Sequence, residues 1–443
     1  MIKTFRKGGI HPPENKLSAH KRIETISIPS QVIIPLAQHI GKPAEAVVKK
    51  GDDVKVGTLI GKADGFVSAN IHSSVSGKVL KVDDTIDASG FRRPAVFIQV
   101  EGDEWEDNID RSETLVKECS LTPQEIKDKI FEAGIVGMGG ATFPLHVKLS
   151  PPPESKAEYL VINAVECEPY LTCDHELMLE KGEEIIVGVT ILMKALGVDK
   201  AIIGIEANKP DAIKKLSEIS KSYNGIEVYA LKVRYPQGAE KQLVEAAIGK
   251  QIKSGALPIS VGVVVVNVAT TFATYEMVQK NKPLIDRVVT VTGKHVKHPC
   301  NALSRIGVSM NMLIEHAGGL PEDTEKVIGG GPMMGKALVS TDIPVTKGSS
   351  GILIVPSVEA QRKQMQNCIR CAKCVSVCCM GLTPFDLMTS AEFSDWDRAE
   401  LLYATDCVEC GSCSFVCPAN RPILDYIRLG KKNIMAARRA RNN

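Results

Sequence analysis

The sequence predicts a multidomain α/β protein, because three kinds of pattern follow one another along its 443 residues. Short β-branched runs separated by turns fill the first quarter, strand-like and helical runs alternate through the middle, and two matching cysteine runs dominate the end. Such changes of pattern mark domain boundaries, and the length suggests about three domains.

Composition narrows the class of protein. Lys and Arg total 54 against 52 acidic residues, so no overall charge attracts nucleic acid. The longest uncharged apolar run, residues 261–273, is shorter than the ~18 residues that a membrane span needs. Nothing at the N-terminus resembles a secretory signal, so we expect the thirteen cysteines to be reduced in a cytoplasm.

The first hundred residues divide into an arm and a β module. Residues 1–30 are expected to form an arm without regular structure, because glycines and prolines interrupt them. Residues 31–105 alternate short strands with turns, and their order resembles the barrel-sandwich hybrid fold of biotinyl and lipoyl carriers. The hairpin at 64–69 lacks the carrier lysine, so the module is expected to be structural.

A glycine-dense loop follows the acidic linker at 101–120. Thr122 and Glu125 form a capping-box pattern, which predicts a helix from there to Gly134. The loop at 134–144 can bring backbone amides close to a phosphate, although a tight turn without a ligand explains such a loop equally well.

Residues 120–280 are predicted to form an α/β domain built on a parallel sheet. Its expected strands and helices alternate along the chain: strands at 159–165, 200–205, 226–233 and 261–268, and helices at 175–196, 210–223 and 239–248. Such alternation indicates a parallel sheet, which binds ligands at the carboxyl ends of its strands. Polar residues stand at three such ends, where helix capping is the alternative explanation.

Residues 284–345 are predicted to form a compact α+β unit, with a strand at 288–292 and a helix at 310–317. His295, His298 and Cys300 fall close together there, but their spacing matches no metal motif, so we expect structural or surface roles. Residues 355–443 are expected to be largely helical, with helices at 359–367 and 395–404.

The two cysteine runs each follow the pattern C-x2-C-x2-C-x3-C, in which the fourth cysteine crosses over to the other [4Fe-4S] cluster. One predicted ligand set is Cys368, Cys371, Cys374 and Cys417, and the other is Cys407, Cys410, Cys413 and Cys378. Zinc favours paired C-x2-C knuckles, and disulfides do not suit a reducing compartment. Cys379 stands where proline usually follows, either as a rival of Cys378 or as a buried thiol.

The motifs together resemble one family. The order GGIHPPENK, carrier-like module, GIVGMGGATFP, INAVECEPYLTCDHELML, YPQGAEKQL and the two cysteine runs resembles the RnfC family of the Rnf ion-translocating ferredoxin:NAD oxidoreductase, over nearly the whole chain. The central part is also similar to the flavoprotein subunit of respiratory complex I. That flavoprotein binds FMN and NADH on a Rossmann-like domain followed by a β-grasp (SLBB) domain.

The similarity to the complex I flavoprotein implies a set of cofactor-binding residues. For the flavin side it comprises Gly137, Gly139, Gly140, Lys148, Asn163, Gly238, Asn267 and Thr270, and Glu166 is a further cofactor-binding candidate. Glu168 and Glu240 match the carboxylates near the nicotinamide nucleotide, and Phe143 is a candidate for stacking. Val165 and Ala239 replace an aspartate and a glutamate of the pattern, so flavin contacts differ in detail.

The Rnf resemblance implies a peripheral subunit on the cytoplasmic face of the bacterial inner membrane, passing electrons between NAD(H), FMN and two [4Fe-4S] clusters. Its implied partners are other Rnf subunits, including membrane-embedded ones that move Na+ or H+ and an iron-sulfur subunit that accepts electrons from ferredoxin. The alternatives are a soluble PduS-like cobalamin reductase, against which the module order speaks, and a non-enzymatic relay or docking protein lacking flavin.

Overall fold

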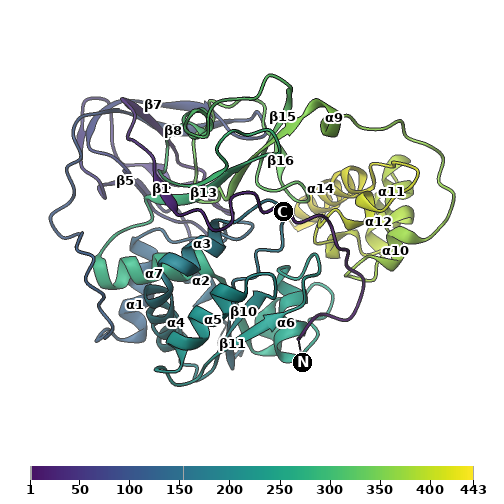
Figure 1. The fold of residues 1–443 in the computed structure, drawn as a ribbon, viewed down its shortest axis with the longest axis horizontal. Coiled ribbons are helices and arrows are strands. Elements are labelled where there is room, and N and C mark those ends of the chain that lie inside the picture. The colour runs from purple at the N-terminus through teal and green to yellow at the C-terminus, as the bar shows by residue number, and fades with distance from the viewer. Residues whose placement is uncertain (1, 153, 443) are drawn as a thin grey trace.

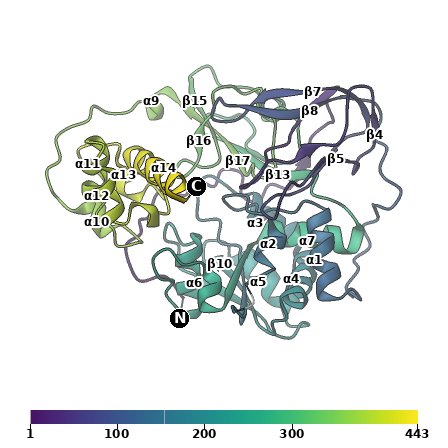
Figure 2. The same cartoon turned by 180° about the vertical axis from the view of Figure 1, so that it is seen from behind.

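The computed structural model describes residues 2–152 and 154–442 and arranges them as several packed units (Figure 1). The α/β domain forms the lower half of this view, and two β-rich units cover it from above. The cysteine-bearing helices form a separate body at one side, which Figure 2 shows from behind. Within the described residues, no helix is long and apolar enough to cross a membrane.

The N-terminal β module is all-β, as predicted. Its two small sheets have the orders β2-β8-β7-β4 and β3-β5-β6. The strands are β2 (Gln31–Pro35), β3 (Glu45–Ala46), β4 (Asp53–Val54), β5 (Leu59–Lys62), β6 (Ile71–His72), β7 (Gly77–Ile86) and β8 (Arg92–Val100). Ile34, Ile60 and Ile98 are fully buried among these strands, so the module has its own apolar core.

The α/β domain is built on a parallel sheet of order β11-β10-β9-β12, as the alternation predicts. Its strands are β9 (Tyr159–Asn163), β10 (Ala201–Glu206), β11 (Ile226–Leu231) and β12 (Val263–Asn267). The helices are α1 (Pro123–Glu132), α2 (Leu145–Lys148), α3 (Cys173–Glu180), α4 (Gly182–Leu196), α5 (Pro210–Ser220), α6 (Glu240–Ile248) and α7 (Val268–Lys280). The predicted capping box between Thr122 and Glu125 is present.

One helix prediction in this domain is wrong in detail. The run at 175–196 is two helices, because the chain leaves helical geometry at Lys181 between α3 and α4. A Cβ at the first residue of α4, Gly182, would lie 3.1 Å from the Ile219 side chain. The break therefore coincides with a close approach between α4 and α5.

The second β-rich unit is a six-stranded sheet of order β1-β14-β13-β17-β15-β16. It contains β13 (Asp286–Thr292), β14 (Cys300–Arg305), β15 (Thr324–Gly329), β16 (Lys336–Ala337) and α8 (Met310–His316). Two expectations are corrected. The arm contributes a strand, β1 (Ile23–Thr25), and β17 (Gly351–Pro356) lies beyond the expected boundary at residue 345.

The C-terminal domain is helical around the cysteines. Its elements are α9 (Ser357–Ala360), α10 (Lys373–Ser376), α11 (Pro384–Glu392), α12 (Trp396–Leu401), η2 (Ala404–Asp406), α13 (Ser412–Phe415) and α14 (Ile423–Asn442). The predicted helix at 359–367 is wrong beyond Ala360, because residues 361–367 are irregular and exposed. That segment offers no apolar face to bury, and short helices need such packing.

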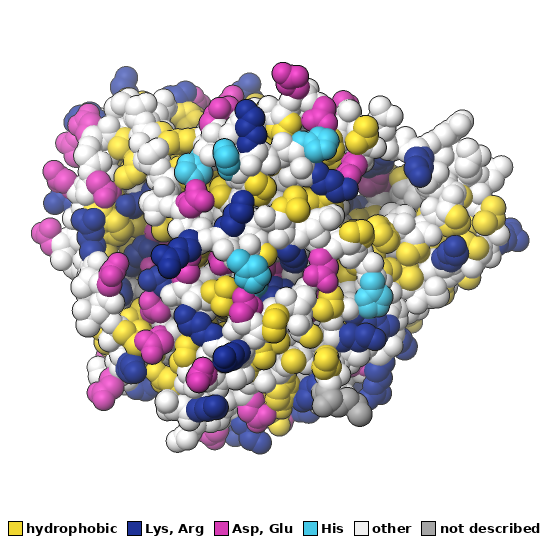
Figure 3. Space-filling model, in the orientation of Figure 1, with side chains coloured by type: hydrophobic (Ala, Val, Ile, Leu, Met, Phe, Trp, Pro, Cys, Tyr) yellow, Lys and Arg dark blue, Asp and Glu magenta, His cyan; other side chains and the backbone are white. Residues whose placement is uncertain are grey.

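The N-terminal arm joins the domains. It runs beside the edge of the α/β sheet and then past the cysteine domain (Figure 1). Lys3 and Ile10 form isolated bridges with Leu231 and Tyr235, and the Gly9 amide donates to the Val377 carbonyl at 2.9 Å. The face drawn in Figure 3 mixes acidic and basic side chains, without one dominant sign of charge.

Candidate functional site

The carboxyl edge of the parallel sheet carries the predicted cofactor residues. The chain passes from β9 to β10 and β11 on one side and then returns to β12 on the other side of β9. Such a reversal of strand order leaves a crevice at the carboxyl ends, where ligands bind in α/β sheets. Asn163 and Asn267 end the two strands that flank this point, and they are paired in the strand register.

The glycine loop lies directly over this edge. The Met138 amide donates to the Thr270 hydroxyl at 2.9 Å, and the Gly137 amide donates to the Phe143 carbonyl at 2.9 Å. A Cβ on Gly139 would lie 2.7 Å from the side-chain amide nitrogen of Asn267, so only glycine fits there without movement. Gly140 is exposed, and a Cβ added there would meet nothing within 4 Å.

Side-chain amides hold the edge together. The Asn267 oxygen accepts from the Ala269 and Thr270 amides at the start of α7, while its nitrogen donates to Asp174 at 2.8 Å. Asn163 donates to the Gly238 carbonyl at 2.8 Å. Two predicted residues, Asn267 and Thr270, therefore also act as the helix cap or its neighbour, the alternative that the sequence left open.

Lys148 and Glu240 form an ion pair of 2.9 Å beside the loop, and the Lys148 ammonium also donates to the Val265 carbonyl at 3.1 Å. Both side chains are partly exposed. The lysine is thus a partly exposed cation beside β12, able to exchange its carboxylate partner for a phosphate.

Glu166 and Glu168 are partly buried, and both carboxylates accept hydrogen bonds from backbone amides. The Glu166 carboxylate accepts from the backbone amides of Asp174 and His175 at the start of α3. One oxygen of Glu168 accepts from the Met333 and Met334 amides, in the turn between β15 and β16. Burial raises the pKa of Glu168. The structure thus uses both carboxylates to join elements, and a nicotinamide contact by Glu168 stays a prediction.

Two lysines that were not predicted as site residues donate hydrogen bonds to backbone carbonyls of residues 165–171. Lys16 of the arm donates to the carbonyls of Glu166, Glu168 and Leu171 at 3.0, 3.0 and 2.6 Å. Lys209, almost fully buried, donates to the Val165 carbonyl at 2.8 Å. Lys16 is the last residue of the motif GGIHPPENK, which was the one signal that could have identified it.

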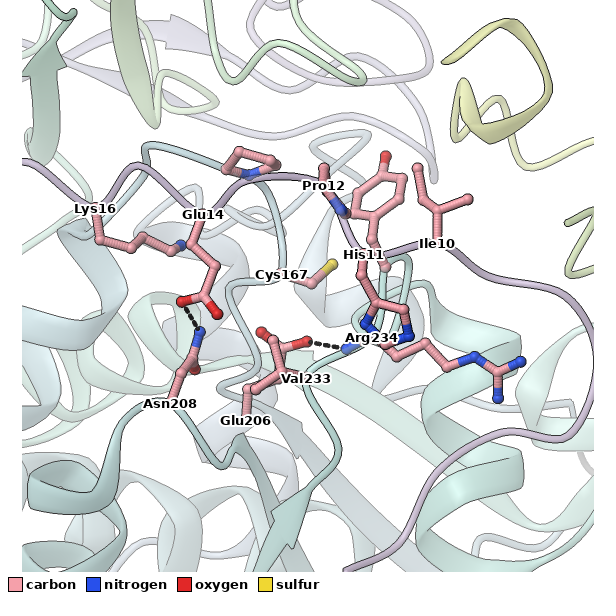
Figure 4. Close-up of a pocket in the computed structure, with 12 residues that line it drawn as sticks. Ile10, His11, Pro12, Glu14, Lys16, Cys167, Glu206, Asn208, Val233 and Arg234 are labelled. Carbon is pink, nitrogen blue, oxygen red and sulfur yellow. Dashed lines mark hydrogen bonds between the residues drawn. The ribbon is translucent and has the colours of Figure 1, made fainter. Parts of the chain in front are cut away.

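A cavity of about 260 Å³ opens between the arm and the segments that follow β9, β10 and β11 (Figure 4). His11 and Glu14 line its arm side, and Cys167, Glu206 and Tyr235 line the other side. The Arg234 amide donates to Glu206, as the close-up shows. Burial raises the pKa of Glu206 to about 7.

The nine cysteines of the C-terminal domain fall into an inner and an outer group. The inner group lines one hollow of the C-terminal domain and comprises Cys378, Cys379, Cys407, Cys410 and Cys413. In the outer group Cys368 and Cys371 are exposed. Burial raises the pKa of the Cys374 thiol, and the neighbouring Cys417 raises it further. This grouping fits the predicted crossover, with Cys379 as an additional thiol in the inner hollow.

The backbone repeats itself around the two cysteine runs. Arg370 and Ala372, on either side of Cys371, have positive φ values of 53° and 57°. Glu409 and Gly411 flank Cys410 in the same way, at 57° and 76°. Three of these four residues are not glycine, so the left-handed turns are strained. Such turns let each loop wrap tightly around its middle cysteine.

Direct contacts join the inner cysteines to the sheet edge. The Tyr235 hydroxyl donates to the Cys410 carbonyl at 2.8 Å, and the Gln242 amide donates to the Cys379 carbonyl at 3.2 Å. Tyr235 belongs to the quoted motif YPQGAEKQL, yet it was not among the predicted site residues. Of the outer cysteines, Cys368 and Cys371 reach the surface.

Family models match three parts of the chain. They are the RnfC barrel sandwich hybrid domain at residues 3–103, the Nuo51 FMN-binding domain at 130–276 and the SLBB domain at 288–337. A chain of the NAD+-reducing [NiFe]-hydrogenase in the H2-reduced state shares the fold, with a TM-score of 0.50 at 18% identity over 72% of this chain and 67% of that chain.

Two relatives match nearly the whole chain. The C component of the proton-translocating ferredoxin:NAD(+) oxidoreductase complex of Clostridium ljungdahlii is 46% identical, covering 99% of this chain and 95% of the relative. The C component of the Na(+)-translocating complex of Acetobacterium woodii is 45% identical, covering 98% of both. The chain therefore belongs to the RnfC family, the C components of ion-translocating ferredoxin:NAD(+) oxidoreductase complexes.

Proposed function

We propose that this chain binds FMN at the β9–β12 edge, binds NAD(H) beside it, and carries two [4Fe-4S] clusters that conduct electrons to or from a partner subunit. The observation that carries the proposal is the Tyr235 hydroxyl bonded to the Cys410 carbonyl, because it joins the sheet edge to the inner cysteines. FMN exchanges two electrons with a nicotinamide as hydride and passes them singly to metal centres, so the two sites must lie close together.

The residues at the edge suit a flavin phosphate. The exposed backbone at Gly139 and Gly140 is open to an anion, and Lys148 supplies a cation at the rim. Asn163 and Asn267 place side-chain amides at the ends of β9 and β12, while the buried Thr270 hydroxyl holds the glycine loop by accepting from the Met138 amide. Glu240 pairs with Lys148 in this structure. When Lys148 binds the flavin phosphate instead, the Glu240 carboxylate becomes available to accept hydrogen bonds from a nucleotide ribose or amide.

The exposed outer cysteines support electron exchange with a partner. Cys368 and Cys371 reach the surface beside Ile369, which is 68% exposed, and Phe415 in the second run is 53% exposed. Apolar residues around a surface redox centre favour contact with another protein. We assign this face to an iron-sulfur subunit that receives electrons from ferredoxin, so that ferredoxin itself acts indirectly.

The membrane-embedded subunits of such a complex would move the ion. Relatives at 46% and 45% identity are named for protons and for Na+, respectively, so the choice of ion does not follow from this chain. We place the chain at the cytoplasmic face, as a peripheral subunit, because its clusters require a reducing compartment.

The test is anaerobic purification followed by flavin, iron and sulfide analysis and an NADH titration of the visible spectrum. The expected result is bound FMN together with bleaching of the flavin and cluster bands by NADH. Lys148→Met should lower FMN content without changing iron, whereas Lys156→Met, a lysine of the loop that follows α2, should change neither. Full iron content with no flavin and no response to NADH would contradict the proposal.

A further inference from the structure

Outside the redox sites, three metal-binding side chains converge near the sheet edge formed by β1. Glu24 belongs to β1, Cys300 begins β14, and His316 ends α8, so residues far apart in sequence meet at one point. One ligand atom from each lies within 4.8 Å of the other two, and the His316 nitrogen is 2.7 Å from a Glu24 oxygen. None of them contributes to the proposed electron path.

The strand register explains why Glu24 and Cys300 meet. Glu24 is paired with Ala302 in the parallel β1–β14 ladder. Cys300 lies two residues before Ala302, and side chains two apart along a strand share one face. Both side chains therefore point to the face of the sheet where His316 lies.

We propose that Glu24, Cys300 and His316 form a binding site for a Zn²⁺-class transition-metal ion. A thiolate, an imidazole and a carboxylate are the ligand types that zinc takes, and adjacent ligand atoms on tetrahedral zinc lie about 3.4–3.6 Å apart. Small side-chain rotations bring these atoms to that spacing. The histidine then exchanges its bond to Glu24 for a bond to the metal, and solvent fills the fourth position.

The site is reached from solvent. Cys300 is buried, whereas the Glu24 and His316 side chains are 49% and 36% exposed. An ion would enter past the carboxylate and the imidazole and close onto the thiol beneath. Because β1 is an edge strand of three residues, a metal bonded to β1, β14 and α8 would fasten the end of the arm to this sheet.

The experiment uses the full chain with its iron-sulfur clusters intact, so that the cluster cysteines are occupied. Equilibrium dialysis against Zn²⁺ under anaerobic conditions, with elemental analysis, should find one zinc per chain. Cys300→Ala, His316→Gln and Glu24→Gln should each weaken binding at least about tenfold, with iron content unchanged. In the wild-type chain, zinc should also slow amide hydrogen exchange at Ile23–Thr25.

A matched control is available in the same domain. His295 and Asp323 form another exposed histidine–carboxylate pair at 2.7 Å, for which the structure shows no third metal-binding side chain among the described residues. His295→Gln should therefore leave zinc binding unchanged. Equal zinc binding by the wild-type and Cys300→Ala chains, or no binding at micromolar free zinc, would overturn the proposal. Because His316 is exposed, its variant tests the site even if Cys300→Ala folds poorly.

Discussion

The two cysteine runs have the same spacing and the same left-handed turns, but they lie in different surroundings. The inner group is enclosed and bonded to the α/β domain through Tyr235 and Gln242, whereas Cys368 and Cys371 of the outer group face solvent. Local sequence thus determines how a cluster would be held, and tertiary packing determines what it can exchange electrons with.

The largest expected effect comes from removing one cluster at a time. Cys410→Ser should lose about half of the iron, because one of two equivalent clusters is lost, and NADH should then fail to reduce the remaining outer cluster. Cys371→Ser should lose as much iron, yet its inner cluster should still be reduced by NADH. Iron analysis with electron paramagnetic resonance of NADH-treated samples checks both variants.

Reduction of the remaining cluster in both variants would contradict the proposed order of the clusters. If the cluster remaining in Cys410→Ser were reduced by NADH as fully as that in Cys371→Ser, the inner group would not lie between the flavin edge and the surface. The two variants control for each other, because each removes the second cysteine of its own run.

A smaller effect separates the two neighbouring thiols in the inner hollow. Both Cys378 and Cys379 line it, and the Leu382 amide donates to the Cys378 sulfur at 3.3 Å. Such amide-to-sulfur bonds are typical of cluster ligands, so Cys378→Ser should lower the iron content and Cys379→Ser should not. The reverse pattern in iron and sulfide analysis would make Cys379 the ligand.

The sequence predicted features that depend on neighbouring residues. The cysteine spacing, the capping box at Thr122 and the alternation of strands and helices all act over short distances, and the structure contains the corresponding elements. The glycine loop and the ends of β9 and β12 also come together as expected, because parallel strands bring their carboxyl ends to one edge.

Features that depend on distant segments were missed. The pairing of β1 with β14 joins residues more than half the chain apart, and no local pattern in an arm rich in glycine and proline signals it. Lys16 bonds the loop that follows β9 only because the arm folds back over that loop. The helix predicted at 359–367 failed for the converse reason: its residues favour helix, but the fold offers them nothing to pack against.

The stability of the folded chain is expected to depend on pH through Glu206, which lines the cavity beside the arm. Burial raises the pKa of Glu206 to about 7, so between pH ~4.5 and 7 the folded chain keeps a proton that the unfolded chain releases. The stability contributed by this protonated group is present below pH ~4.5 and is lost as the pH rises through 7. Glu206→Gln cannot titrate, so its stability relative to wild type should increase by up to about 3 kcal/mol from pH 5 to pH 8.

Urea unfolding at several pH values measures that difference. The Lys209 ammonium, 3.9 Å from Glu206, lowers the pKa of this carboxyl and so opposes the effect of burial, and the value of about 7 already includes it. Glu218→Gln, at an exposed position of α5, is the control and should show no comparable change with pH. A parallel pH dependence in the wild-type and Glu206→Gln chains would show that Glu206 titrates normally.

The smallest expected effect concerns the contact that joins the two regions. Tyr235→Phe keeps the buried ring but removes the hydroxyl that donates to the Cys410 carbonyl, which should cost about 1 kcal/mol. The loss should appear as a lower urea midpoint for bleaching of the cluster absorbance. Tyr229→Phe removes a hydroxyl that bonds Glu227 on the exposed side of the same sheet, and it should leave that midpoint unchanged. Equal shifts in the two variants would mean that the cysteine domain is held by the arm and by Gln242, without a measurable contribution from Tyr235.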